Sequence, residues 1–228
     1  MITAIKQAIQ MVLSGDSQLF QIIGVTLRMS LTSSLAALLI GVPPGILVSM
    51  YNFKGKNALI VLNRTLMGLP PVVCGLLCYM LFSGNGPLGY MKLLFTVKAM
   101  IIAQVILITP QIIGNTESYM RLICDDIRAT ALGLSLPKGK ILLLALNESK
   151  YQIISTYLFG FSRGIAEVGA VSMVGGAIAF KTNVMTTAIM NYTNRGDFTM
   201  GVALGMILLA MSLILNCSVY LIQGKVNK

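Results

Sequence analysis

Residues 160–176 read GFSRGIAEVGAVSMVGG, an apolar stretch that holds an arginine and a glutamate four positions apart. Each charge at the centre of a membrane costs about 2.5–3.5 kcal/mol on insertion scales. A helix brings positions i and i+4 onto one face, so Arg163 and Glu167 are predicted to pair and partly offset this cost. Two costly groups at this depth indicate a polar path, a buried contact or a gate.

The composition of the whole chain agrees with a membrane location. Of the 228 residues, 56% are hydrophobic and only 11% are charged, and the mean hydropathy is +0.82. A soluble domain carries about 25% charged residues. We therefore expect an integral membrane protein whose surroundings are a lipid bilayer. The excess of Lys+Arg (17) over Asp+Glu (7) then indicates a basic cytoplasmic face rather than a nucleic-acid partner.

Five apolar stretches predict five membrane spans, because a helix needs about 20 residues to cross the hydrocarbon. They cover residues 19–50, 57–82, 98–115, 151–176 and 198–222. Helical spacing of isoleucines before them predicts a short interfacial amphipathic helix over residues 1–18. We expect one transmembrane domain over residues 19–222, and a cytoplasmic tail over residues 223–228. The distribution of lysine and arginine places the N-terminus outside and the C-terminus inside.

The longest polar segment covers about residues 117–150, on the predicted inner side. Asp125 or Asp126 is predicted to cap a short helix, since acidic side chains favour helix N-termini. Gly133 and Pro137 then interrupt the pattern, and a second short helix is predicted from Lys138 to Ser149. Two short helices joined by a kinked turn form a docking surface, and the segment is too short for a catalytic domain.

Prolines occur inside three of the predicted spans, and each removes a backbone hydrogen bond and kinks its helix. The pairs are Pro43-Pro44 and Pro70-Pro71, and the single residue is Pro110. Kinked spans beside buried charges predict a bundle that encloses a cavity. No G-x-x-x-x-G-K-[ST] motif is present, so the sequence offers no phosphate-binding loop and no nucleotide cofactor is expected on it. No catalytic set and no metal site are expected either.

Three motifs carry a resemblance to a known family. Residues 68–76 read GLPPVVCGL, residues 86–89 read GPLG, and residues 162–176 read SRGIAEVGAVSMVGG. Together they resemble the membrane permease subunits of ABC importers that carry molybdate, sulfate and tungstate. The segments MTTAI at 185–189 and RGDF at 195–198 are most similar to the tungstate permeases. Three positions depart from the pattern: Ala129 replaces a glutamate and Ser135 a glycine in the coupling loop, and Ala177 replaces an asparagine.

The resemblance implies an all-α, five-span type I importer bundle with a cytoplasmic coupling helix, in a bacterial or archaeal inner membrane. Two copies of the chain would form the channel, and an extracytoplasmic oxyanion-binding protein would deliver the anion. Two ABC ATPase subunits, which hold the ATP and Mg, would drive alternating access. The expected docking residues for the ATPase are Asp125, Asp126, Arg128, Ala129, Thr130, Ala131, Gly133, Ser135 and Lys138. The expected path or gate residues are Arg163, Glu167, Ser162, Gly164, Pro70 and Pro71.

Three alternatives stay open from the sequence alone. Arg163 either faces the transported anion or only pairs with Glu167. The substrate is tungstate by the resemblance, with molybdate or sulfate as the alternative. A secondary transporter or channel is the alternative of another class, and it would carry its substrate without ATP.

Overall fold

The computed structural model describes the backbone of residues 6, 10, 13–135 and 137–226, which is helical without any strand. This confirms the all-α prediction. The amphipathic helix predicted over residues 1–18 falls mostly outside the described residues, as does the end of the predicted tail. The described helices are α2 (Ser17–Met50), α3 (Lys56–Met67), α4 (Pro71–Phe82), η1 (Gly89–Met91), α5 (Val97–Gly133), α6 (Lys138–Glu148), α7 (Lys150–Ile165), α8 (Gly169–Gly175), α9 (Met185–Asn194) and α10 (Phe198–Val226).

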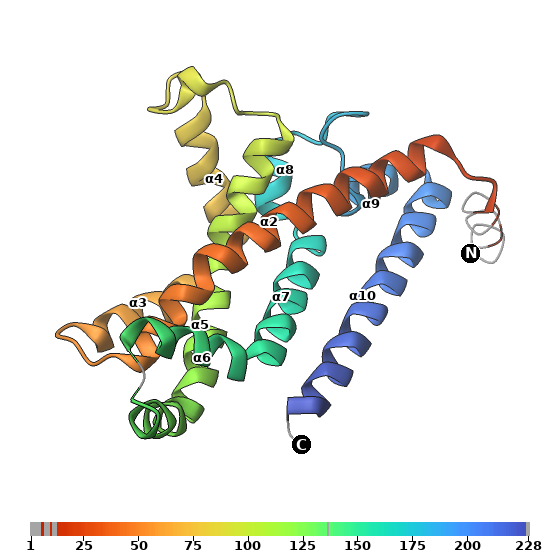
Figure 1. Cartoon of the computed structure of the whole chain (residues 1–228). Coiled ribbons are helices and arrows are strands. Elements are labelled where there is room, and N and C mark those ends of the chain that lie inside the picture. Colours follow the sequence, from red (N-terminus) through yellow and green to blue (C-terminus); the bar gives the residue numbers. More distant parts are fainter. Residues whose placement is uncertain (1–5, 7–9, 11–12, 136, 227–228) are drawn as a thin grey trace.

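The long helices α2 and α5 cross at the centre of the molecule (Figure 1). Helix α7 packs against both, α10 runs beside α7, and α4 packs against α8. Glycines allow the close approach of α2 to α5. A Cβ added at Gly45 would lie 2.7 Å from the Cβ of Thr116, and one at Gly41 would lie 2.9 Å from Ile112 Cγ2. Small residues at a helix contact are a common packing device in membranes.

Three described helices are long and apolar enough to cross a membrane: α2, α5 and residues 198–222 of α10. Helices α3 and α4 pass the same test only as a pair. These helices indicate that the chain is a multi-pass membrane protein. Helix α7 has only 16 residues, so the count of five spans stays a prediction.

The predicted span over residues 57–82 is not one helix. Helices α3 and α4 meet at an angle of 96°. Pro70 is extended and Pro71 is the first residue of α4. Proline suits a first helical position because its missing N–H is not needed there, and it disfavours helical geometry in the residue before it. The bend therefore follows from the Pro70-Pro71 pair. By contrast, α2 remains helical through Pro43 and Pro44.

The predicted end of a helix near residue 115 is also wrong. Helix α5 continues to Gly133, so Asp125 and Asp126 lie inside it and cap no helix start. Met120, Ile127 and Ala131 are buried along this extension. Their burial makes a continuous helix favourable despite the polar sequence. The second predicted short helix is confirmed as α6, whereas α9 was not predicted.

Two left-handed backbone positions coincide with departures from the family pattern. Ser135 and Ala177 both have φ of +48°. The left-handed region costs roughly 1–2 kcal/mol for most residues, but glycine and asparagine adopt it readily. The glycine and asparagine that the resemblance implies at these positions would suit this backbone better than Ser135 and Ala177 do.

Replacing Ala177 with asparagine should therefore stabilise the protein, by up to about 1 kcal/mol. Unfolding can be followed in detergent with a thiol-reactive dye, because Cys74, Cys78 and Cys124 are buried. Exposed Cys217 is first replaced by serine. The control is Ala58→Asn, at an exposed position inside α3, which should lower stability through helix propensity. A fall in stability for Ala177→Asn would contradict this explanation.

Candidate functional site

The segment between α7 and α8 breaks the helix that was predicted to pair Arg163 with Glu167. Helix α7 ends at Ile165 and α8 begins at Gly169. Arg163 is exposed and Glu167 is buried, and among the described residues no ion pair joins them. The predicted pairing is wrong, because the two positions do not share one continuous helix.

Glu167 instead stabilises the break itself. Its Oε1 accepts a hydrogen bond from the backbone N–H of Ala170 at 3.1 Å, where a negative charge suits the start of α8. Its backbone carbonyl accepts a bond from the hydroxyl of Thr186 at 2.9 Å. Arg163 lies in the last turn of α7, where a positive charge is favourable for the helix dipole. A role for Arg163 on an anion path stays a prediction.

Gln104 of α5 ties the end of α7 to α2. Its amide nitrogen donates to the carbonyl of Gly164 at 2.7 Å, and its amide oxygen accepts from the hydroxyl of Ser33 at 2.6 Å. The Gln104 side chain is almost fully buried. Buried polar groups need partners, so these two bonds fix three helices relative to one another. Sequence patterns gave no signal for this residue, which lies in an otherwise apolar span.

The 185–189 segment, which carries the tungstate-type resemblance, forms the start of α9. The N–H of Met185 donates to the Thr26 hydroxyl of α2 at 2.9 Å. The Thr187 hydroxyl accepts from the N–H of Val184 at 3.1 Å. Together with the bond from Thr186 to Glu167, these contacts place α9 against both α2 and the break. The motif therefore has a structural role in the fold.

The structure brings two of the family-like motifs together. A Cβ added at Gly169 would lie 2.9 Å from Val72 Cγ2, just after Pro71, and one at Gly75 would lie 2.8 Å from the Cα of Ala170. Helices α4 and α8 thus touch at glycine positions on both sides. Gly164 and Pro70-Pro71 both border backbone breaks. Ser162 of α7 lines a cavity of about 180 Å³ between α7 and α10.

A buried carboxylate that the sequence reasoning missed is Glu117 of α5, which is only 2% exposed. Arg64 of α3 contacts its Oε2 at 3.3 Å, and Arg121 contacts its Oε1 at close range. Arg64 also donates to Ser118 at 2.9 Å. The spacing of Glu117 and Arg121 is a signal for a helix pair, but Arg64 is distant in sequence. The cluster fastens α3 to α5 and carries a net charge of about +1 with both arginines charged.

The docking candidates lie at the end of α5 and the start of α6. The Asp125 side chain is largely exposed and lies 3.6 Å from Arg128, while Arg128 also donates to the carbonyl of Met50. Asp126 and Thr130 line a cavity of about 170 Å³ beside α6.

The remaining docking candidates differ in exposure. Ala129 is exposed and Ala131 is buried. Gly133 is the last residue of α5 and Lys138 the first of α6, with Ser135 in the left-handed turn between them. The sequence reasoning overlooked exposed leucines here, Leu132, Leu134 and Leu143.

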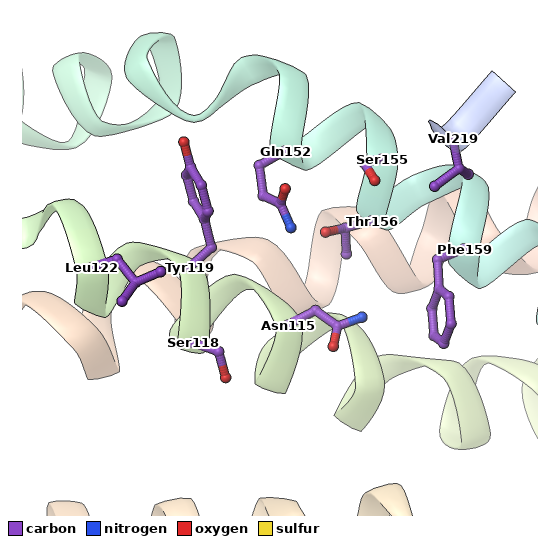
Figure 2. Close-up of a pocket in the computed structure, with 9 residues that line it drawn as sticks. All are labelled: Asn115, Ser118, Tyr119, Leu122, Gln152, Ser155, Thr156, Phe159 and Val219. Carbon is purple, nitrogen blue, oxygen red and sulfur yellow. The ribbon is translucent and has the colours of Figure 1, made fainter. Parts of the chain in front are cut away.

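A polar cavity of about 380 Å³ lies between α5, α7 and α10 (Figure 2). Its polar lining comes from α5 and α7: Asn115, Ser118, Tyr119, Gln152, Ser155 and Thr156. Val219 contributes from α10. None of the lining residues is Asp, Glu, Lys or Arg.

Replacing Gln104 with leucine should destabilise the protein by about 1–3 kcal/mol, because two buried hydrogen bonds are lost at similar side-chain volume. The measurement is again the dye-reported unfolding of the Cys217→Ser protein. Gln111→Leu is the control, since the buried Oε1 of Gln111 has no hydrogen-bond partner among the described residues. Equal destabilisation by the two changes would contradict the role given to Gln104.

The Glu117 cluster should respond asymmetrically to mutation. Removing both partners in Arg64→Leu/Arg121→Leu leaves a buried carboxylate unpaired and should cost about 3 kcal/mol or more. Glu117→Leu should cost less, because the arginine side chains are 51% and 57% exposed and can be hydrated. Adding Glu117→Leu to the double variant should recover stability. If the single and double variants unfold equally easily, the burial argument fails.

Comparison with known proteins identifies the family. Residues 35–228 match the family described as binding-protein-dependent transport system inner membrane component. A tungstate uptake system permease protein of Peptoclostridium acidaminophilum is 35% identical over 218 residues, which cover 96% of each chain. A probable anion ABC transporter permease protein of Haloferax volcanii is 36% identical, over 89% of this chain and 90% of its own.

More distant relatives include a sulfate transport system permease protein of Salmonella typhimurium. It is 25% identical, over 90% of this chain and 76% of its own. The matches extend over nearly the whole chain, so they include the motifs that α4 and α8 bring together. The chain therefore belongs to the binding-protein-dependent inner membrane components, as an ABC-transporter permease of the oxyanion group.

Proposed function

We propose that this chain is the permease subunit of an ATP-driven tungstate importer. The observation that carries this proposal is the similarity to two tungstate uptake permeases, at 35% identity in each case. The sulfate permeases are less similar, at 24–25% identity. Molybdate or sulfate is the alternative cargo.

In this proposal two copies of the chain form the channel and a separate extracytoplasmic protein delivers the anion. Two ABC ATPases, which hold ATP and Mg, bind the cytoplasmic ends of α5 and α6. The N-terminus is outside and the C-terminus is cytoplasmic. ATP-driven movement of the ATPases then alternates access to the channel. The break at Pro70-Pro71 supports this mechanism, since a short non-helical segment can act as a hinge between rigid helices.

The proposed ATPase contact combines apolar and charged groups. Leu132 and Leu143 are 80% and 67% exposed, on a segment with Asp125, Arg128 and Lys138. Exposed leucines at the polar end of α5 and in α6 favour a protein partner. The extension of α5 beyond the expected end of its span supports a rigid link from the channel to this surface.

The transport proposal is tested with the assembled system in proteoliposomes. The chain, its ATPase and its binding protein should take up tungstate only with ATP, as measured by mass spectrometry of the lumen. The purified chain alone should hydrolyse no ATP. Uptake that continues without ATP would favour the secondary-transporter alternative. Faster uptake of molybdate or sulfate at equal concentrations would reassign the cargo.

The docking surface is tested by cysteine cross-linking in the Cys217→Ser background. Cysteines at Leu132 and Leu143 should each form an adduct with the ATPase, because both side chains are exposed on the proposed contact. Tyr90→Cys is the control, since Tyr90 is 78% exposed and belongs to η1. The segment after α4 lies at the opposite end of the molecule from α6 (Figure 1). Adducts at Tyr90 but at neither leucine would refute this surface.

A further inference from the structure

One side chain that lines the cavity between α5, α7 and α10 has a buried hydroxyl group without a hydrogen-bond partner among the described residues. Thr156 is 2% exposed, and its Oγ1 has no hydrogen-bond partner among the described residues. A threonine inside a helix usually bonds to the carbonyl one turn earlier. Figure 2 shows this oxygen on the cavity side of α7, together with the amide of Gln152. The Thr156 hydroxyl is therefore available to a group that enters the polar cavity.

The rest of the polar lining can supply several further donors. Asn115 and Gln152 each carry an amide NH2 group, and Tyr119 carries a phenolic O–H. Within the described part of the chain, neither of these amides takes part in a hydrogen bond. No carboxylate lines the cavity. An anion is therefore not repelled here, and several donors can turn towards it.

A positive charge lies beside one wall of the cavity, while Tyr119 on another wall also borders a cavity lined by Asp126 and Glu148. Ser118, on the cavity wall, accepts a hydrogen bond from Arg64 at 2.9 Å. Arg64 belongs to the Glu117 cluster, which contains two arginines and one glutamate. Its net positive charge lies one side chain away from the cavity. The guanidinium group of Arg64 thus places a positive charge, which attracts an anion, beside the cavity without lining it.

We propose that this cavity is a transit site for a tetrahedral oxyanion, bound by the neutral donors of Asn115, Gln152 and Thr156. The inference rests on the transport function proposed above and adds a place in the chain where the cargo stops. Neutral donors suit such a site, because conduction requires binding that is favourable enough to enter and weak enough to leave. A direct arginine contact would hold the anion more strongly.

The test compares Thr156→Val/Gln152→Leu with the unmodified chain in the assembled transporter. Hydrogen bonds to a charged group contribute more to binding than neutral ones do. Because the double variant removes two such donors to the anion, it should lower kcat/KM for tungstate uptake about tenfold or more. Binding of sodium tungstate to the purified full chain in detergent should weaken by a similar factor. ATP hydrolysis and assembly with the ATPase should be unchanged.

The matched control is Thr116→Val. Thr116 also has a buried hydroxyl without a partner, but it packs against Gly45 and does not line the cavity. This variant should transport and bind tungstate like the unmodified chain. An equal loss in both variants would show a general effect on helix packing and would overturn the site.

Two further outcomes separate the inference from its alternatives. If the unmodified transporter works and the double variant keeps the same kcat/KM, the transit site is wrong while the proposed function stands. If the unmodified transporter carries no oxyanion, the proposed function itself fails. Co-purified lipid phosphorus is measured in parallel. A loss of phosphorus without a change in tungstate binding would assign the cavity to a lipid headgroup and overturn the proposal.

Discussion

The hydrogen bonds of Gln104 are the interaction on which the arrangement of the bundle depends. Hydrocarbon offers no partner for a free backbone group, so non-helical backbone is tolerated only where protein or an aqueous cavity satisfies it. Helix α7 ends within the bundle, and the carbonyl of Gly164 near that end is bound by Gln104. The same side chain binds Ser33. The Gly164 carbonyl also accepts from the N–H of Glu167 at 3.3 Å. The buried amide of Gln104 thus helps to satisfy the end of α7 and links it to α2 and α5.

A second set of hydrogen bonds satisfies backbone groups at the α8 side of the break. These bonds also hold segments that are distant in sequence against one another. Glu167 binds the start of α8 through its carboxylate and Thr186 through its carbonyl. Thr26 binds the start of α9. These contacts join α2, α8 and α9 around residues 166–168. Glu167 thus has a structural role in an apolar stretch, because it caps the start of α8. Among the described residues it makes no ion pair with Arg163.

The sequence predicted the long apolar helices and the helix over residues 138–149, because hydropathy and local breakers are encoded within each segment. It did not predict the break at 166–168, because the apolar pattern continues across it and the stabilising threonine lies 19 residues later. It also missed the Glu117 cluster, since Arg64 is 53 residues away. Both features depend on tertiary contacts. The bend at Pro70-Pro71, by contrast, has a local cause, although the angle was not foreseen.

The structural role of the 185–189 segment bears on how a substrate preference should be read from sequence. Thr186 and Thr187 are engaged with the Glu167 carbonyl and the start of α9, so their hydroxyls are not free to contact an anion. A motif shared with tungstate permeases can therefore mark a common way of holding the α7–α8 break. Discrimination between similar oxyanions requires groups that touch the cargo. In the transit site proposed above, Asn115, Gln152 and Thr156 would touch the cargo, whereas the threonines of the motif are already engaged.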